Sequence, residues 1–185
     1  QDAGDAYNTA IGFNSGKEIT TGVQNTIIGG QAGDALTTGN SNVALGYGAL
    51  SSEDTGSRNI AIGRLALFNQ NYNGEAYNIA VGHNAGLSIT TGVQNTIIGG
   101  LAGDALTTGD NNVVLGYQAL TTEQAGGRNV AIGTYALQDL NTGSNAYNVA
   151  VGHAVGSQMT TGTRNTLVGA FAGDALTSGY YNTAL

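Results

Sequence analysis

Only a few residue types in this chain could carry chemistry, and their spacing keeps them apart. His83 and His153 lie 70 positions from one another, and Asp34, Asp104 and Asp174 repeat at the same interval. A metal ion needs several ligands that converge on one point, and hydrolytic catalysis needs a grouped Ser, His and Asp or a pair of carboxylates. No unit of the sequence groups such residues. We therefore predict no catalytic residue, no metal site and no cofactor, with the His exposed and the Asp exposed or capping turns.

Aromatic side chains could instead bind a ligand. Tyr72, Tyr77 and Tyr147 occur among Asn and Asp residues in the segments 68–77 and 138–147, where the sequence is locally two residues longer. Loops that project from a rigid scaffold are common binding sites, and aromatic and amide side chains suit sugar rings. One hypothesis is that these Tyr contact a surface glycan. The alternative, which we favour at this point, is a longer turn whose Tyr pack down onto the protein.

Arginine and asparagine occupy neighbouring positions of a repeated motif. Arg58, Arg128 and Arg164 each come immediately before an Asn, and two of them lie within reach of Glu53 or Glu123 in the sequence, so we expect surface ion pairs. The Asn opens the motif Asn-x-small-aliphatic-Gly, and stacked copies of it can hydrogen-bond as a ladder and satisfy turn backbone groups. We predict this structural ladder at Asn8, Asn25, Asn42, Asn59, Asn78, Asn95, Asn112, Asn129, Asn148, Asn165 and Asn182.

The ladder asparagines define an internal period that must organise the elements. Successive Asn are 17 residues apart, except for steps of 19 after Asn59 and Asn129, and four consecutive steps span 70 residues. The run 25–39 recurs at 95–109 and 165–179, as duplication of a four-unit block would produce. We predict one repeat domain over residues 1–185. Its coils begin near residues 8, 25, 42, 59, 78, 95, 112, 129, 148, 165 and 182.

A unit of this length predicts a β-solenoid. Seventeen residues are too few for a helical hairpin or a propeller blade, whose repeats need about 33 to 50 residues. At 8–12, branched or aliphatic residues at the second and fourth positions alternate with Ala at the third, which is the period of a strand. Thr-Thr-Gly turns follow, so we expect one strand, a bend, a second short strand and a return. The predicted fold class is all-β, a parallel β-solenoid of about ten 17-residue coils, about 48 Å long at about 4.8 Å per coil.

The small residues of the strands predict an oligomer. Branched side chains share one face of each strand, whereas Ala and Gly share the other, which only a closely approaching surface can bury. A thin coil of Ala, Thr and Gly also buries little apolar area per residue. We therefore expect several chains to lie against one another, as an intimate homotrimer.

Composition narrows the range of partners. The 185 residues include 5 basic and 12 acidic side chains, for a net charge of −7, which argues against nucleic acid or an anionic membrane surface. No apolar run approaches the roughly 18 residues needed to span a bilayer, so we expect no membrane-spanning segment. The absence of Cys excludes disulfides and thiolate metal sites and leaves the redox compartment undecided.

The repeats resemble those of known surface proteins. The segments NTAIG at 8–12, NIAIGRLAL at 59–67 and NVAIGTYAL at 129–137 are similar to repeats of trimeric autotransporter adhesin heads. Together with the Thr-Thr-Gly turns they resemble even more closely the repeats of phage tail fibres, and the resemblance covers residues 4–185. It implies a left-handed trimeric β-roll at an extracellular location, on a cell surface or a virion.

Function follows as an expectation from the fold and the resemblance. We expect a structural or adhesive segment of a trimeric extracellular fibre that presents or spaces receptor-binding surfaces. The alternative is a self-assembling extracellular filament subunit, because the chain stops four residues into an eleventh coil and leaves an open strand edge. An ice-binding protein is less favoured because its ranks of Thr are broken in two of every four coils, and a polysaccharide depolymerase because paired carboxylates are absent.

Overall fold

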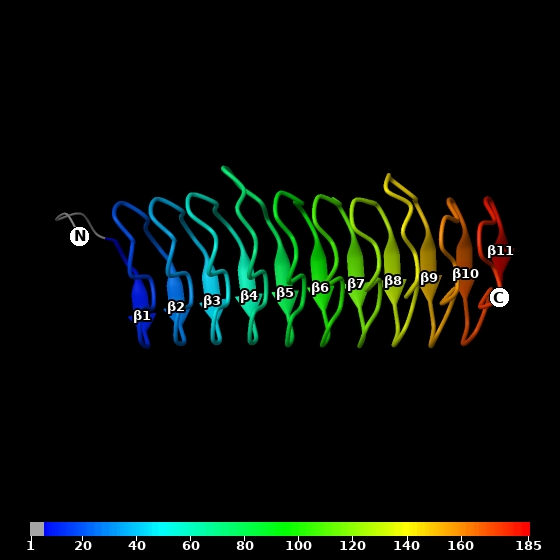
Figure 1. Cartoon of the computed structure of the whole chain (residues 1–185), viewed down its shortest axis with the longest axis horizontal. Helices are drawn as coiled ribbons and strands as arrows, with labels where there is room; N and C mark the ends of the chain where they lie inside the picture. Colours follow the sequence, from blue (N-terminus) through cyan, green and yellow to red (C-terminus); the bar gives the residue numbers. More distant parts are fainter. Residues whose placement is uncertain (1–5) are drawn as a thin grey trace.

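The computed structural model describes residues 6–185, and residues 1–5 of the predicted repeat domain lie outside the described residues. Eleven short strands form one sheet in the order of the sequence (Figure 1). Neighbouring strands are parallel and in register, so that Thr26 lies beside Val43 and Ile28 beside Leu45. The strands are β1 (Thr9–Ile11), β2 (Thr26–Ile28), β3 (Val43–Leu45), β4 (Ile60–Ile62), β5 (Ile79–Val81), β6 (Thr96–Ile98), β7 (Val113–Leu115), β8 (Val130–Ile132), β9 (Val149–Val151), β10 (Thr166–Val168) and β11 (Thr183–Ala184).

This architecture confirms the predicted parallel β-solenoid of about ten coils of about 17 residues. The element order contains strands alone and no helix within residues 6–185. Consecutive coils therefore lie one above another, each adding a strand to the same sheet.

Each coil contains a single strand, so the predicted second strand is wrong. Beyond the strand the chain passes through left-handed residues such as Leu50 and Leu67, with φ of 55° and 50°, and a left-handed residue interrupts the extended backbone of a strand. Hydrogen bonds between coils continue all the same: the Gly33 N–H donates to the Ala49 carbonyl at 2.9 Å, and the Leu50 N–H to the Ala66 carbonyl at 3.0 Å. Stacking thus satisfies the backbone polar groups without a second sheet.

The core lies inside the narrow coil. The third strand residue points inward, as at Ala44 and Ala61, and meets residues such as Ala49, Ala66 and Leu67, all fully buried. Our expectation that the small face of the strand would meet other chains is therefore wrong for these residues. The opposite wall of the same coil is the closely approaching surface, and the branched residues at the second and fourth positions face outward.

The glycine that ends each strand is required by the spacing between coils. Gly46 has a φ of +135°, and a Cβ added to it would lie 2.5 Å from the carbonyl oxygen of Gly63. Gly63 meets Gly82 in the same way, at 2.3 Å. Only a residue without a side chain allows the coils to stack at the distance of a hydrogen-bonded sheet.

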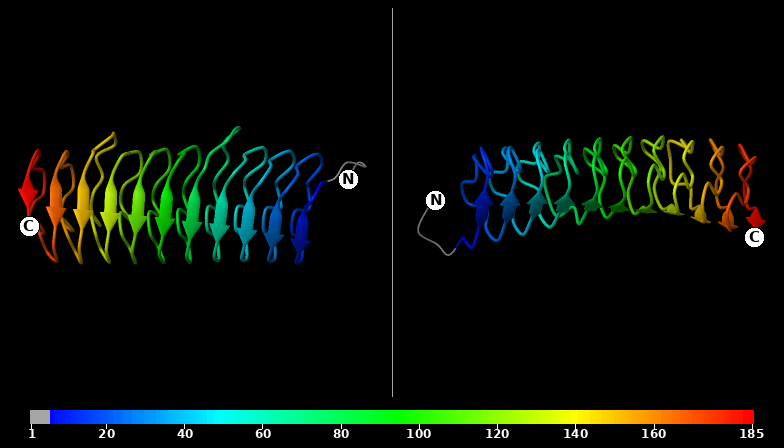
Figure 2. Two further views of the ribbon diagram at one scale, coloured as in Figure 1. Left: turned by 180° about the vertical axis from the view of Figure 1, so that it is seen from behind. Right: turned by 90° about the horizontal axis from the view of Figure 1, so that it is seen from below.

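The whole molecule is a gently curved rod with its sheet along one side and turns along the others (Figure 2). Figure 1 shows two loops, after β4 and after β8, that extend beyond the remaining turns. These loops hold the two-residue insertions. Among residues 6–185, no helix has the length and apolar character needed to cross a lipid bilayer.

Candidate functional site

The repeated Asn stack into an unbroken column at the start of the strands. Asn42 is representative: its Oδ1 accepts from the Asn59 backbone N–H at 2.9 Å, and its Nδ2 donates to the Gly56 carbonyl at 2.9 Å. The N–H to Oδ1 contact recurs at every step from Asn8 to Asn182. Those from Asn25 to Asn165 are fully or almost fully buried. Each amide therefore holds the strand entry of the next coil and closes the turn of its own.

The column changes where a coil is longer. Gln70 lies inside the fourth coil, donates from Nε2 to Asn59 Oδ1 at 3.1 Å, and accepts from Asn78 Nδ2 at 2.9 Å. In the second block Leu140 takes this place, and Asn148 Nδ2 reaches Asn129 Oδ1 at 3.3 Å. The first insertion is thus bridged by a buried amide, and the second by an apolar residue.

Two buried carboxylates were not expected from the sequence. Glu53 accepts from the Gly56 N–H at 2.8 Å and from the Tyr72 N–H of the next coil at 3.3 Å. Glu123 accepts from the Gly126 N–H at 2.8 Å and from both the N–H and the hydroxyl of Thr142 at 2.9 Å. Burial raises the pKa of Glu53, although the backbone N–H groups that bind its carboxylate oppose this.

The buried carboxylates correct our prediction of surface ion pairs with arginine. Glu53 and Glu123 are fully buried, and Arg58 pairs instead with Glu75, at 3.0 Å. A signal was present in the sequence: each Glu stands three residues before a turn Gly, at the position that Leu36 and Leu106 occupy in neighbouring coils. An acidic residue at a core position of a repeat indicates a buried cap.

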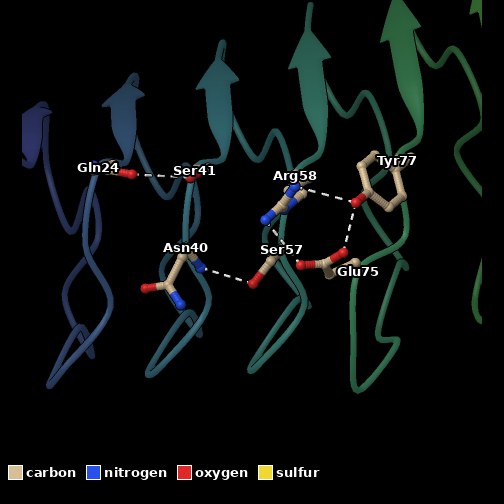
Figure 3. Close-up of polar contacts among 7 residues, drawn as sticks. All are labelled: Gln24, Asn40, Ser41, Ser57, Arg58, Glu75 and Tyr77. Atoms are coloured by element: carbon tan, nitrogen blue, oxygen red, sulfur yellow. Dashed lines mark hydrogen bonds and ion pairs between the residues drawn. The ribbon is translucent and has the colours of Figure 1, made fainter.

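The residue before each ladder Asn forms a second column, which lies on the surface. We call it the outer column. All its members have a left-handed backbone, and Figure 3 shows four of them, from Gln24 to Tyr77, at the entries of successive strands. The outer column consists of Tyr7, Gln24, Ser41, Arg58, Tyr77, Gln94, Asn111, Arg128, Tyr147, Arg164 and Tyr181.

Arginine and tyrosine stack within the outer column. The Arg58 guanidinium lies 5.5 Å from the centre of the Tyr77 ring and donates to the Tyr77 hydroxyl at 3.1 Å, and that hydroxyl donates to Glu75. In the second block the Tyr147 ring lies 5.5 Å from the guanidinium of Arg128 and 5.6 Å from that of Arg164. These are cation–π distances.

The three Tyr named as glycan contacts therefore have different places. Tyr77 and Tyr147 stand in the outer column, about 43–44% exposed, with guanidinium groups against their ring faces. Tyr72 stands in the first long loop, half-buried, with its ring against Gly74. The structure does not bring the three together.

The outward side of the sheet is apolar. Its second and fourth strand positions include Leu45, Ile98, Val113 and Leu115, which are 37–42% exposed. Beyond the glycine bend a chain of rings borders this surface, with centroids 5.3–6.0 Å apart. Its members are Tyr117, Tyr135, His153 and Phe171. We call the outward strand residues the aliphatic face.

The polar residues first considered for chemistry stay dispersed. His83 contacts only Arg64 among polar groups, at 3.3 Å, and His153 lies in the chain of rings. Asp34 accepts from Ser51 Oγ, and burial raises the pKa of half-buried Asp104. Within residues 6–185, no three His, Asp or Glu side chains gather in a group that could hold a metal ion.

The Thr-Thr-Gly turns use their hydroxyls inside the rod. Thr20 and Thr90 donate to the carbonyls of Thr37 and Thr107 in the next coil, each at 3.2 Å, and Asp54 interrupts the rank above Thr37. The surfaces that remain for partners are therefore the aliphatic face and the outer column. In comparisons with known proteins, no protein-family model, curated protein or solved structure matches the chain.

Proposed function

We propose that this chain is a structural segment of a homotrimeric extracellular fibre, on a cell surface or a virion, that spaces and presents binding surfaces. The observation that carries the proposal is the aliphatic face, which runs along the sheet from β1 to β11. An apolar surface that follows every coil of a rod is what a lengthwise partner of equal length would cover.

The size of this face supports burial against another chain. Ten coil spacings and a strand three residues wide give a footprint of about 48 Å by 10 Å, or about 480 Å². This equals the largest apolar patch of a typical monomer, about 300–600 Å². Tyr47 and Tyr117, about half exposed beside the face, widen it further.

Three chains rather than two suit the shape of the surface. The aliphatic face and the chain of rings lie on either side of the glycine bend, so each chain presents two adjoining apolar surfaces. In a threefold arrangement each chain meets two neighbours and can bury both surfaces. The resemblance to trimeric adhesin heads and phage tail fibres supports the same stoichiometry and a left-handed winding.

The mechanism of such a segment is mechanical. Backbone groups pair from coil to coil along the rod, and each repeat contacts only its neighbours, so that the coils stack into an extended solenoid. No step of this function needs a catalytic group. Loops and surface columns carried by the rod supply contacts with receptors.

Light scattering on the purified chain tests this proposal. We expect a discrete particle with three times the mass of one chain, and a shift to monomer in the Val113→Lys/Leu115→Lys variant, because two charges would be buried in each interface. Thr108→Lys, at an exposed turn position, is the matched control and should remain trimeric. A monomeric or dimeric wild type, or filaments that lengthen with concentration, would overturn the trimer.

A further inference from the structure

The chain has very few cations, and two of them flank one tyrosine. Only 5 of the 185 residues are Lys or Arg, yet Arg128 and Arg164 lie on opposite sides of the Tyr147 ring, at 5.5 and 5.6 Å. Arg128 Nη1 also donates to the Tyr147 hydroxyl at 2.9 Å. A cationic cluster in a chain with a net charge of −7 needs an explanation beyond surface solubility.

Comparison of the two 70-residue blocks isolates this cluster. In the first block Arg58 and Tyr77 are neutralised by Glu75, which pairs with the guanidinium at 3.0 Å and accepts from the Tyr77 hydroxyl. Seventy residues later, the place of Glu75 is taken by the neutral Asn145, and that of Gln94 by Arg164. The second block has thus lost an acid and gained a base on the same geometry.

No carboxylate pairs with the second cluster in residues 6–185. The salt bridges of this region involve Lys17 and Arg58 alone. Asp110, one coil before Arg128, directs its Oδ1 to the Val93 N–H at 2.7 Å. The two guanidinium groups keep N–H donors for an external anion, and Tyr147 beside them is 43% exposed.

We propose that Arg128, Tyr147 and Arg164 bind an anionic polysaccharide, a deeper assignment that rests on the proposed role of the rod as a carrier of binding surfaces. The two guanidinium groups are two coils apart, about 10 Å, which corresponds to the spacing of acidic groups on alternate sugars of an extended chain. Each can hold a carboxylate or sulfate through paired N–H donors. Because guanidinium groups cover both ring faces, Tyr147 contributes its hydroxyl and positions the two Arg, rather than stacking on a sugar.

Polysaccharide is the favoured polyanion because the rest of the chain is acidic. Nucleic acid binding gains affinity from many Lys and Arg contacts along a phosphate backbone, whereas here the cations are confined to two or three coils. A glycan with widely spaced acidic groups needs only those coils. The surrounding hydroxyl and amide side chains can bind its neutral hydroxyl groups.

The test measures binding of the full chain, in its native oligomeric state, to immobilised alginate, dextran sulfate, neutral dextran and a single-stranded oligonucleotide. We expect binding to alginate or dextran sulfate, whichever acid the site takes, no binding to dextran, and weaker binding to the oligonucleotide. Asn145→Glu, which restores the acid of the first block and keeps the Arg and Tyr in place, should weaken binding about tenfold. Arg128→Gln/Arg164→Gln should abolish it.

Matched variants of the first block supply the controls. Arg58→Gln should bind like the wild type, because Glu75 already neutralises that position. Glu75→Asn/Gln94→Arg, which copies the second block into the first, should raise the stoichiometry from one site per chain to two. Thermal melts of each variant separate loss of binding from loss of folding.

Three outcomes would overturn the site: unchanged affinity in a folded Asn145→Glu variant, equal binding to dextran, or tighter binding to the oligonucleotide. The mass of the same samples by light scattering reports separately on the trimer. A trimer that binds no acidic glycan refutes this site alone, and a monomer that binds it refutes only the trimer.

Discussion

Glu53 stands in a core position of the repeat because a neighbouring leucine fills the space that an aliphatic side chain needs elsewhere. In coils with Gly at the ninth position, such as Gly103, an added Cβ would lie 3.0 Å from the side chain of Leu106 at the twelfth. The third coil has Leu50 at the ninth position and Glu53 at the twelfth. The carboxylate is then free to turn toward the Gly56 N–H.

This residue predicts an unusual dependence of stability on pH. Burial raises the pKa of Glu53 in the folded chain, so the folded state binds a proton more tightly than the unfolded state does. The contribution of Glu53 is fully present below the unfolded pKa, about 4.3, and is lost as pH rises through the folded pKa. We expect Glu53→Gln to remove this loss.

Melting temperatures between pH 4 and 7, at constant ionic strength, measure the effect. The difference between wild type and Glu53→Gln should change across this range in favour of the variant as pH rises. Glu18→Gln, at an exposed carboxylate paired with Lys17, is the control and should follow the wild type. Parallel curves for Glu53→Gln and wild type would contradict the assignment.

At the scale of the coil, the ladder amides join neighbouring elements. The Asn112 Nδ2 donates to Gly126 and Asn95, and its Oδ1 accepts from the Asn129 N–H. Their removal in Asn112→Ala leaves a buried N–H and a buried carbonyl without partners. Each such group costs about 1–3 kcal/mol, so we expect a loss of about 2–5 kcal/mol in the free energy of unfolding.

Urea unfolding measures this loss, and another Asn serves as the control. Asn40 is exposed and makes one side-chain contact, from the Val23 N–H, so Asn40→Ala should cost about 1 kcal/mol or less. Equal effects of the two substitutions would show that the ladder is no more than a surface feature.

Periodicity was sufficient to predict the strands and their order, but not which side of each strand faces inward. Alternation shows which residues share a face, and Ala44 and Val43 are both apolar, so either face could be the core. The width of the coil decides: only small residues such as Ala44 and Ala49 fit between its two walls. The second strand was overpredicted because left-handed leucines such as Leu50 have no signature in composition.

The candidate sites show the same limit. The position of Tyr77 just before Asn78 was visible, but the insertion before it drew attention to a loop, whereas Tyr77 belongs to the same column as Arg58. Glu53 and Glu123 read as surface charges, since burial of a carboxylate depends on backbone N–H groups that only the folded turn brings together. Contacts across an insertion lie outside what a simple period predicts.

At the scale of the whole molecule, stacking in register predicts that a complete block can be removed. Deletion of residues 78–147 joins Tyr77 to Asn148, which repeats the native junction of Tyr147 and Asn148. We expect a folded rod shorter by four coils, about 19 Å. Small-angle scattering measures the length, and deletion of residues 78–140, out of phase with the coils, should give an unfolded or aggregated chain.

The glycines at the strand ends and the outward positions beside them have opposite tolerance for change. Gly46 and Gly116, in equivalent coils of the two blocks, leave no room for a Cβ, whereas Leu65 and Leu101 in the first block become Tyr135 and Phe171 in the second. The rod therefore works as an invariant spine with interchangeable surface lettering. A new specificity can be written on one coil by a few substitutions, without any cost to the scaffold that carries it.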